Sequence, residues 1–187
     1  MHILRKLTGL IDELNDKIGA VIRWLVLIMV LIGAVNAMAR YFARSQQWAL
    51  NLTPATEAQW YLFSVIFLMG AAYGLNHDVH VRVDVLYERL SAKAQAWIDL
   101  LGTVVFLIPF SVLMLYVSFP AVRASWSVRE VSPDPGGLPR YPIKALILVS
   151  FTLLLLQAFS QIMKQVDVIR GAAPDLDPHQ GEPEEHL

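Results

Sequence analysis

The sequence contains no cysteine, which excludes disulfide bonds, thiolate nucleophiles and cysteine-ligated metals and leaves the redox compartment unread. Charged residues are also scarce: they make up 17% of the chain against 56% for hydrophobic residues, a balance far from that of soluble proteins. The net charge of −1 and the lack of a basic cluster give no indication of nucleic-acid binding. This composition predicts a membrane protein.

Four stretches contain no Asp, Glu, Lys, Arg or His, and each approaches the roughly 20 apolar residues that cross a bilayer as a helix. The stretches are 24–39, 58–76, 100–122 and 145–163, and the predicted spans are about 21–42, 58–77, 97–122 and 143–164. A cleaved signal peptide is the alternative for the first stretch, because Ala37-Met38-Ala39 resembles a cleavage site. The charged region before it runs to Arg23 and its apolar run is long, which favours an uncleaved span.

These patterns predict an all-α membrane protein with four transmembrane helices in a domain at 21–169. Lys and Arg are more frequent in the flanks on the side of the two termini than on the opposite side, which predicts both termini inside (N-in, C-in). Residues 1–20 have a helical stripe of apolar side chains and are expected to form an amphipathic interfacial helix, or to dock on a partner subunit. The tail at 170–187 is acidic and is expected to be disordered.

The lack of an ionisable residue in the four stretches is the most informative absence for function. Ion-coupled carriers use intramembrane carboxylates or histidines, so we expect that this chain transports nothing by itself. A haem subunit would need histidines inside the spans, and His77 and His80 lie at the predicted membrane boundary instead. The sequence also lacks a phosphate loop, a nucleophile triad and a zinc-protease motif, so we expect no enzyme activity.

After the second stretch the sequence changes to a charged, alternating segment. His77, Asp78, His80 and Asp84 suggest a metal site, but Arg82 shares a face with His80 and Asp84 in such a segment and argues against a bound cation. We therefore expect an ion-paired or hydrogen-bonded elbow at the membrane surface and no metal.

Three further features bear on helix packing. Gly70 and Gly74 form a small-xxx-small pair that would allow another helix to approach closely. Pro109 predicts a kink, Ser91 is a plausible helix cap, and the Pro- and Gly-rich loop at 119–141 is expected to be an ordered cap.

Polar side chains also lie along one face of the fourth span: Ser150, Gln157 and Gln161. At intervals of seven and four they predict a helix-contact face. The same face would have to line the pore if the chain were a self-assembling four-helix channel or small exporter, which stays open as an alternative function.

Residues 57–91, EAQWYLFSVIFLMGAAYGLNHDVHVRVDVLYERLS, resemble the signature of the small membrane subunit of tripartite ATP-independent periplasmic (TRAP) transporters, the DctQ-like family. The later segment EVSPDPGGLPRYPIKALI, followed by a Leu-rich span that ends in LLLLQAF, is similar to the longer members of that family. The resemblance covers about residues 18–169.

The resemblance implies a complex of three parts in the bacterial inner membrane. A periplasmic substrate-binding protein captures a solute, usually a carboxylate, and a large permease subunit carries it by a sodium-driven elevator movement. The small subunit binds the static scaffold of the permease, needs no cofactor and is surrounded by membrane lipids. Carried over to this sequence, the resemblance places Glu57 and Trp60 at the start of the motif helix and assigns His80, Arg82 and Asp84 to structure and assembly.

Overall fold

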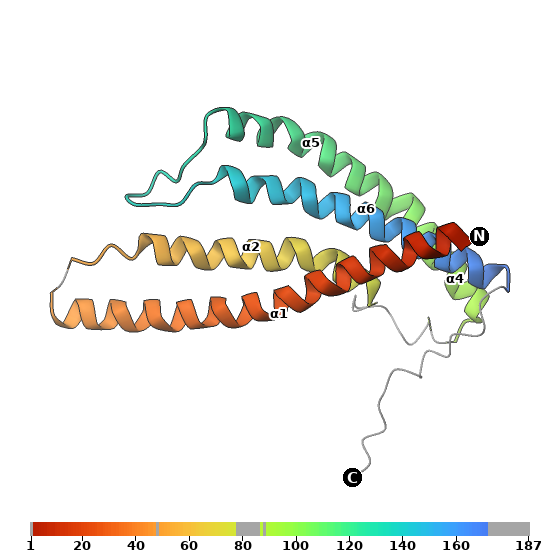
Figure 1. The fold of residues 1–187 in the computed structure, drawn as a ribbon, viewed down its shortest axis with the longest axis horizontal. Coiled ribbons are helices and arrows are strands. Elements are labelled where there is room, and N and C mark those ends of the chain that lie inside the picture. Colours follow the sequence, from red (N-terminus) through yellow and green to blue (C-terminus); the bar gives the residue numbers. More distant parts are fainter. Residues whose placement is uncertain (1, 48, 78–86, 88, 172–187) are drawn as a thin grey trace, which may run out of the picture.

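The computed structural model describes residues 2–47, 49–77, 87 and 89–171, with side chains from Lys6 onward (Figure 1). Throughout this part of the chain the elements are helices, and the single β-bridge, between Val131 and Pro139, is isolated. The helices are α1 (His2–Ser45), α2 (Thr53–Asn76), α4 (Ala92–Gly102), the π-helical turn η1 (Thr103–Leu107), α5 (Ile108–Ser127) and α6 (Tyr141–Ile169). The predicted all-α fold is confirmed.

Four helical stretches are long and apolar enough to cross a membrane, as predicted. They are Lys6–Ser45, Thr53–Asn76, Ala92–Ser127 and Tyr141–Ile169, the third of which combines α4, η1 and α5. Most of them extend past the predicted spans, because helices continue beyond the charge-free core into polar flanks. The N-in, C-in orientation stays a prediction.

The first helix passes through the predicted domain boundary at residue 20 without a break and is 44 residues long. In its first turns the polar side packs inward: Asn15 is fully buried. Leu7, Leu10 and Leu14 face outward, with 44%, 62% and 44% of their surface exposed. The lead-in is therefore part of the bundle and presents its apolar stripe to the surroundings.

Figure 1 shows two helical hairpins, in which α1 lies beside α2 and α5 lies beside α6. Helix α6 is the centre of the bundle, since it contacts α1, α2, α4, η1 and α5. A small apolar core joins the hairpins, formed by Ala72 of α2 with Leu153 and Leu154 of α6. Partly buried apolar side chains from α1, α2, η1 and α6 pack against this core: Ile18, Met69, Ala71, Leu75, Leu107 and Phe151.

The third span begins and bends where the sequence indicates. Ser91 caps α4, because its Oγ accepts a hydrogen bond from the Ala94 N–H at 3.4 Å, as predicted. Pro109 has no N–H to donate, and the helix ahead of it widens into a π-helical turn in which the Ile108 N–H bonds to the Thr103 carbonyl. Figure 1 shows the chain changing direction between α4 and α5, so the predicted kink has a π-turn as its physical form.

Candidate assembly site

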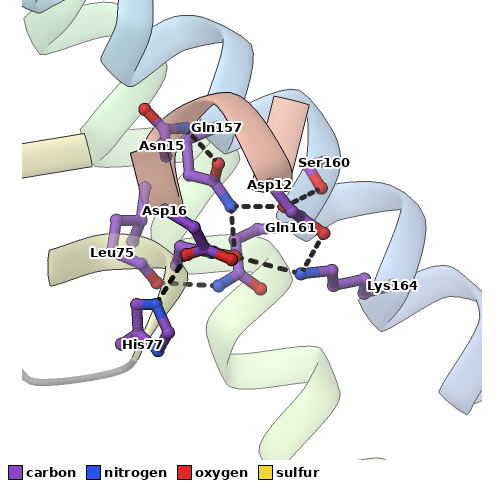
Figure 2. Close-up of polar contacts among 10 residues, drawn as sticks. Asp12, Asn15, Asp16, Leu75, His77, Gln157, Ser160, Gln161 and Lys164 are labelled. Carbon is purple, nitrogen blue, oxygen red and sulfur yellow. Dashed lines mark hydrogen bonds and ion pairs between the residues drawn. The ribbon is translucent and has the colours of Figure 1, made fainter. Parts of the chain in front are cut away.

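The polar side chains of the bundle gather at its two ends. The first group, which we call the terminal cluster, lies at the end that holds the N-terminus and is drawn in Figure 2. Its members come from the start of α1, the end of α2 and the second half of α6: Asp12, Asn15, Asp16, Asn76, His77, Gln157, Ser160, Gln161 and Lys164.

Gln157 is the centre of the terminal cluster and is fully buried. Its Oε1 accepts a hydrogen bond from Asn15 Nδ2 at 2.6 Å. Its Nε2 donates to Asp12 Oδ1 at 3.0 Å and to Asn76 Oδ1 at 2.9 Å. One side chain of α6 thus connects α1 and α2, which is the role that a buried amide takes among membrane helices.

Asp12 is the second centre of the cluster (Figure 2). Its Oδ1 also accepts a hydrogen bond from the Ser160 hydroxyl at 2.9 Å, and its Oδ2 lies 2.8 Å from Lys164 Nζ. The two charged side chains are 22% and 40% exposed, so the pair lies at the edge of the bundle rather than in its middle. The carboxylate is therefore balanced in charge and its oxygens are satisfied by α6.

The end of α2 joins the same cluster through Asp16. Asp16 Oδ1 accepts a hydrogen bond from Asn76 Nδ2 at 3.1 Å and lies 2.7 Å from His77 Nε2. His77 is thus engaged by α1. The remaining members of the predicted metal and elbow motif, Asp78, His80, Arg82 and Asp84, lie outside the described residues.

A close approach of α1 and α2 next to the cluster depends on a glycine that the sequence reading did not single out. The ring of Tyr73 packs directly on Gly19, where a Cβ atom would overlap its Cγ, Cδ2 and Cε2. At the predicted glycine pair the situation differs: a Cβ on Gly70 would meet only Ile22 Cδ1, at an ordinary 3.9 Å, and Gly74 is buried. At Gly19, unlike at Gly70, an added side chain would therefore clash with the facing helix.

The predicted contact face of α6 packs against other helices of the same chain. The Ser150 hydroxyl donates to the Leu68 carbonyl at 2.5 Å, and Gln161 Nε2 donates to the Leu75 carbonyl at 2.9 Å. With Gln157, these side chains are at most 8% exposed. Ser160 and Lys164 continue this face of α6 at three- and four-residue intervals. On α1 the same helical spacing places Asp12, Asn15 and Asp16 on one face. Both patterns can be recognised in the sequence.

At the opposite end, the loop between α5 and α6 is fastened to α2 by Glu57. This carboxylate is 3% exposed and accepts hydrogen bonds from the Leu138 N–H, at 2.5 Å, and from the Ser132 hydroxyl. The Tyr61 hydroxyl reaches the Pro139 carbonyl at 3.0 Å. Glu57 therefore anchors a loop within the chain. This loop is shorter than predicted, because α5 continues to Ser127 and residues 119–127 are helical, so that the cap comprises residues 128–140.

Two cations lie where α6 begins. Lys144 forms an ion pair with Glu130 of the loop, and the hydrogen bond from Lys144 holds the pKa of Glu130 below its ordinary value. The guanidinium carbon of Arg140 lies 6.0 Å from the centre of the Trp60 ring, a cation–π distance. Trp60, predicted as an assembly residue, is 39% exposed and packs beside the loop anchor.

The polar side chains at both ends of the bundle connect helices, or a helix and the loop, within one chain. Residues 29–168 match the family model described as tripartite ATP-independent periplasmic transporters, DctQ component. No curated protein and no solved structure matches the chain significantly. The chain, a multi-pass membrane protein by its four apolar helices, therefore belongs to the DctQ family of TRAP transporter components.

Proposed function

We propose that this chain is the small membrane subunit that binds and stabilises the scaffold of the large elevator-type permease subunit in a bacterial inner membrane. In this proposal a periplasmic binding protein delivers a carboxylate-type solute, and sodium drives its uptake through the large subunit. The observation that supports the proposal most is the use of polar side chains in the described spans: Ser150, Gln157 and Gln161 bond to the chain's own helices.

A subunit that stays still beside a moving partner needs a rigid bundle with an apolar exterior. The terminal cluster connects α1, α2 and α6, and Glu57 fastens the loop to α2 at the other end. Large apolar side chains cover the outer surfaces, among them Phe67 on α2 and Tyr116 on α5, which are 69% and 79% exposed. Such surfaces suit contact with lipid or with another membrane subunit.

The channel or exporter alternative receives less support. A pore would require the polar face of α6 to point toward symmetry-related copies, yet Gln157 is fully buried between α1, α2 and α6. Turning it outward would leave Asp12, Asn15 and Asn76 without these hydrogen bonds, which is costly in a membrane.

Co-purification tests the proposed partner. An affinity tag on this chain should retain the large permease subunit after solubilisation in mild detergent, at a fixed ratio. An unrelated four-helix membrane protein with the same tag serves as the control. Recovery of this chain alone or as a homo-oligomer, from membranes that contain both subunits, would contradict the scaffold role.

A further inference from the structure

A pocket opens between the two hairpins at the end of the bundle that carries the loop. Figure 1 shows that α2 and α6 diverge toward this end. The pocket between them has a volume of about 280 Å³. Its lining comes from α2 and from the start of α6: Trp60, Ser64, Leu68, Arg140, Ile143, Lys144 and Ile147.

The mouth of this α2/α6 pocket is cationic. Arg140 and Lys144 are among its lining residues, and Lys144 is already paired with Glu130. Arg140 has no carboxylate within salt-bridge distance in the described part of the chain. Its Nη2 donates a hydrogen bond to the Ser132 hydroxyl at 3.4 Å, its charge acts on the nearby Glu57 and Glu130 carboxylates, and its Nε is buried without a hydrogen-bond partner. A guanidinium with an unsatisfied donor favours an anion with several oxygen atoms, such as a phosphate.

The start of α6 supplies a second, independent attraction for an anion. Arg140 is the N-cap residue of this 29-residue helix, no side chain caps it, and its first turn contains no acidic residue. The first backbone N–H groups of a helix and its dipole favour negative charge at this place. Trp60 lines the same mouth and is the residue type that prefers the level of lipid headgroups.

Below the mouth the walls are apolar. Leu68, Ile143 and Ile147 line this part, and the Ser64 hydroxyl is satisfied by the Trp60 carbonyl of its own helix at 2.8 Å. Surfaces that lack partner atoms lose dispersion energy, so a pocket of this kind in a bilayer favours a hydrocarbon chain. The combination of a cationic mouth and a dry interior matches a molecule with an anionic head and an apolar tail.

We propose that the α2/α6 pocket binds one anionic phospholipid, with its phosphate at Arg140 and the start of α6 and one acyl chain between α2 and α6. The lipid would fill the space between the two hairpins and fasten them together beside the Glu57 anchor. The site would lie in the outer leaflet if the predicted N-in orientation holds. The proposal does not depend on the identity of the large subunit.

Phosphatidylglycerol added to the delipidated full-length chain in detergent is the probe, and native mass spectrometry counts the bound lipid. We expect one tightly retained phosphatidylglycerol and much less retention of phosphatidylcholine. Arg140→Gln should weaken binding about tenfold, as expected for one charge-assisted contact. Arg123→Gln removes an exposed external arginine near the same leaflet and should leave binding unchanged.

Ser64→Phe fills the pocket and keeps both cations, so it should also reduce retention even if Arg140→Gln fails to fold. Thr152→Phe is its control, because the Thr152 hydroxyl bonds its own helix in the same way and its side chain is exposed. Equal retention of the two lipids, or unchanged retention in Ser64→Phe, would overturn the proposal. Equal thermal protection by glycerol 1-phosphate and by phosphatidylglycerol would also overturn it, because it would indicate a site for the anion alone. Displacement of the lipid by the large subunit would overturn it as well.

Discussion

Asn15 and Gln157 are 142 positions apart in the sequence, and their side-chain amides meet at 2.6 Å in a fully buried contact between α1 and α6. The contact joins the amphipathic lead-in of the chain to the centre of the bundle. Because Gln157 also bonds to Asp12 and Asn76, three elements depend on one side chain.

Gln157→Leu is expected to destabilise the bundle by about 2 kcal/mol, since it removes three hydrogen bonds between helices and each membrane hydrogen bond contributes roughly 0.6 kcal/mol. Thermal unfolding in detergent measures the loss. Thr152→Leu, on the exposed side of the same helix, should change stability little. Equal stability of Gln157→Leu and the wild type would show that the terminal cluster does not fasten α1.

The Asp12–Lys164 ion pair should show a coupling energy of about 1 kcal/mol in a double-mutant cycle with Asp12→Asn and Lys164→Gln. Each single change leaves a partly buried charge without its partner, so the double variant should lose less than the sum of the two. Glu13 and Lys17 form an exposed pair on α1 and provide the control, for which we expect almost no coupling. Additive effects at Asp12 and Lys164 would contradict the role of the pair.

Gly19→Ala should lower stability by about 1–3 kcal/mol, because its methyl group would overlap the Tyr73 ring and force α1 and α2 apart. Gly70→Ala provides the matched control, since the space beside Gly70 accepts a methyl group. Thermal unfolding in detergent measures the stability of the two variants. If Gly70→Ala were less stable than Gly19→Ala, the tighter helix contact would lie at the predicted Gly70–Gly74 pair.

The loop contact between Glu130 and Lys144 should depend on pH. The Glu130 carboxyl group has a lower pKa in the folded protein than in the unfolded chain. Such a group stabilises the folded protein at any pH above its pKa in the unfolded chain, and this stabilisation is lost as the pH falls through its pKa in the folded protein. The difference in melting temperature between the wild type and Glu130→Gln should thus be present at pH 7 and shrink below the ordinary glutamate pKa of about 4.3. Asp134→Asn, in the same loop, should follow the wild type. A difference that is independent of pH would refute the prediction.

The sequence predicts the four long helices, the Ser91 cap and the bend at Pro109 well, because each depends on local chemistry: apolar runs, a hydroxyl before a helix and a missing N–H. It also singles out Ser150, Gln157 and Gln161 by their spacing. It does not identify their partners, because these depend on how each helix is rotated about its axis. For the same reason the fit of Tyr73 on Gly19 could not be read from spacing alone.

Glu57 shows a second limit of local patterns. The sequence places Glu57 at the start of a helix and does not reveal its partner. Its carboxylate bonds to the loop about 80 residues later, with separations of 75 and 81 positions. A loop with several Pro and Gly residues has few local partners for its N–H groups, and a buried carboxylate from another element satisfies them. The predicted roles of His80, Arg82 and Asp84 in assembly stay predictions.

Solute uptake by proteoliposomes tests the central claim most directly. The vesicles would contain this chain alone, the large permease subunit alone, or both, each with the periplasmic binding protein and a sodium gradient. The scaffold role predicts sodium-dependent uptake of a carboxylate only when both subunits are present. Uptake by this chain alone, or full uptake by the large subunit without it, would contradict the claim.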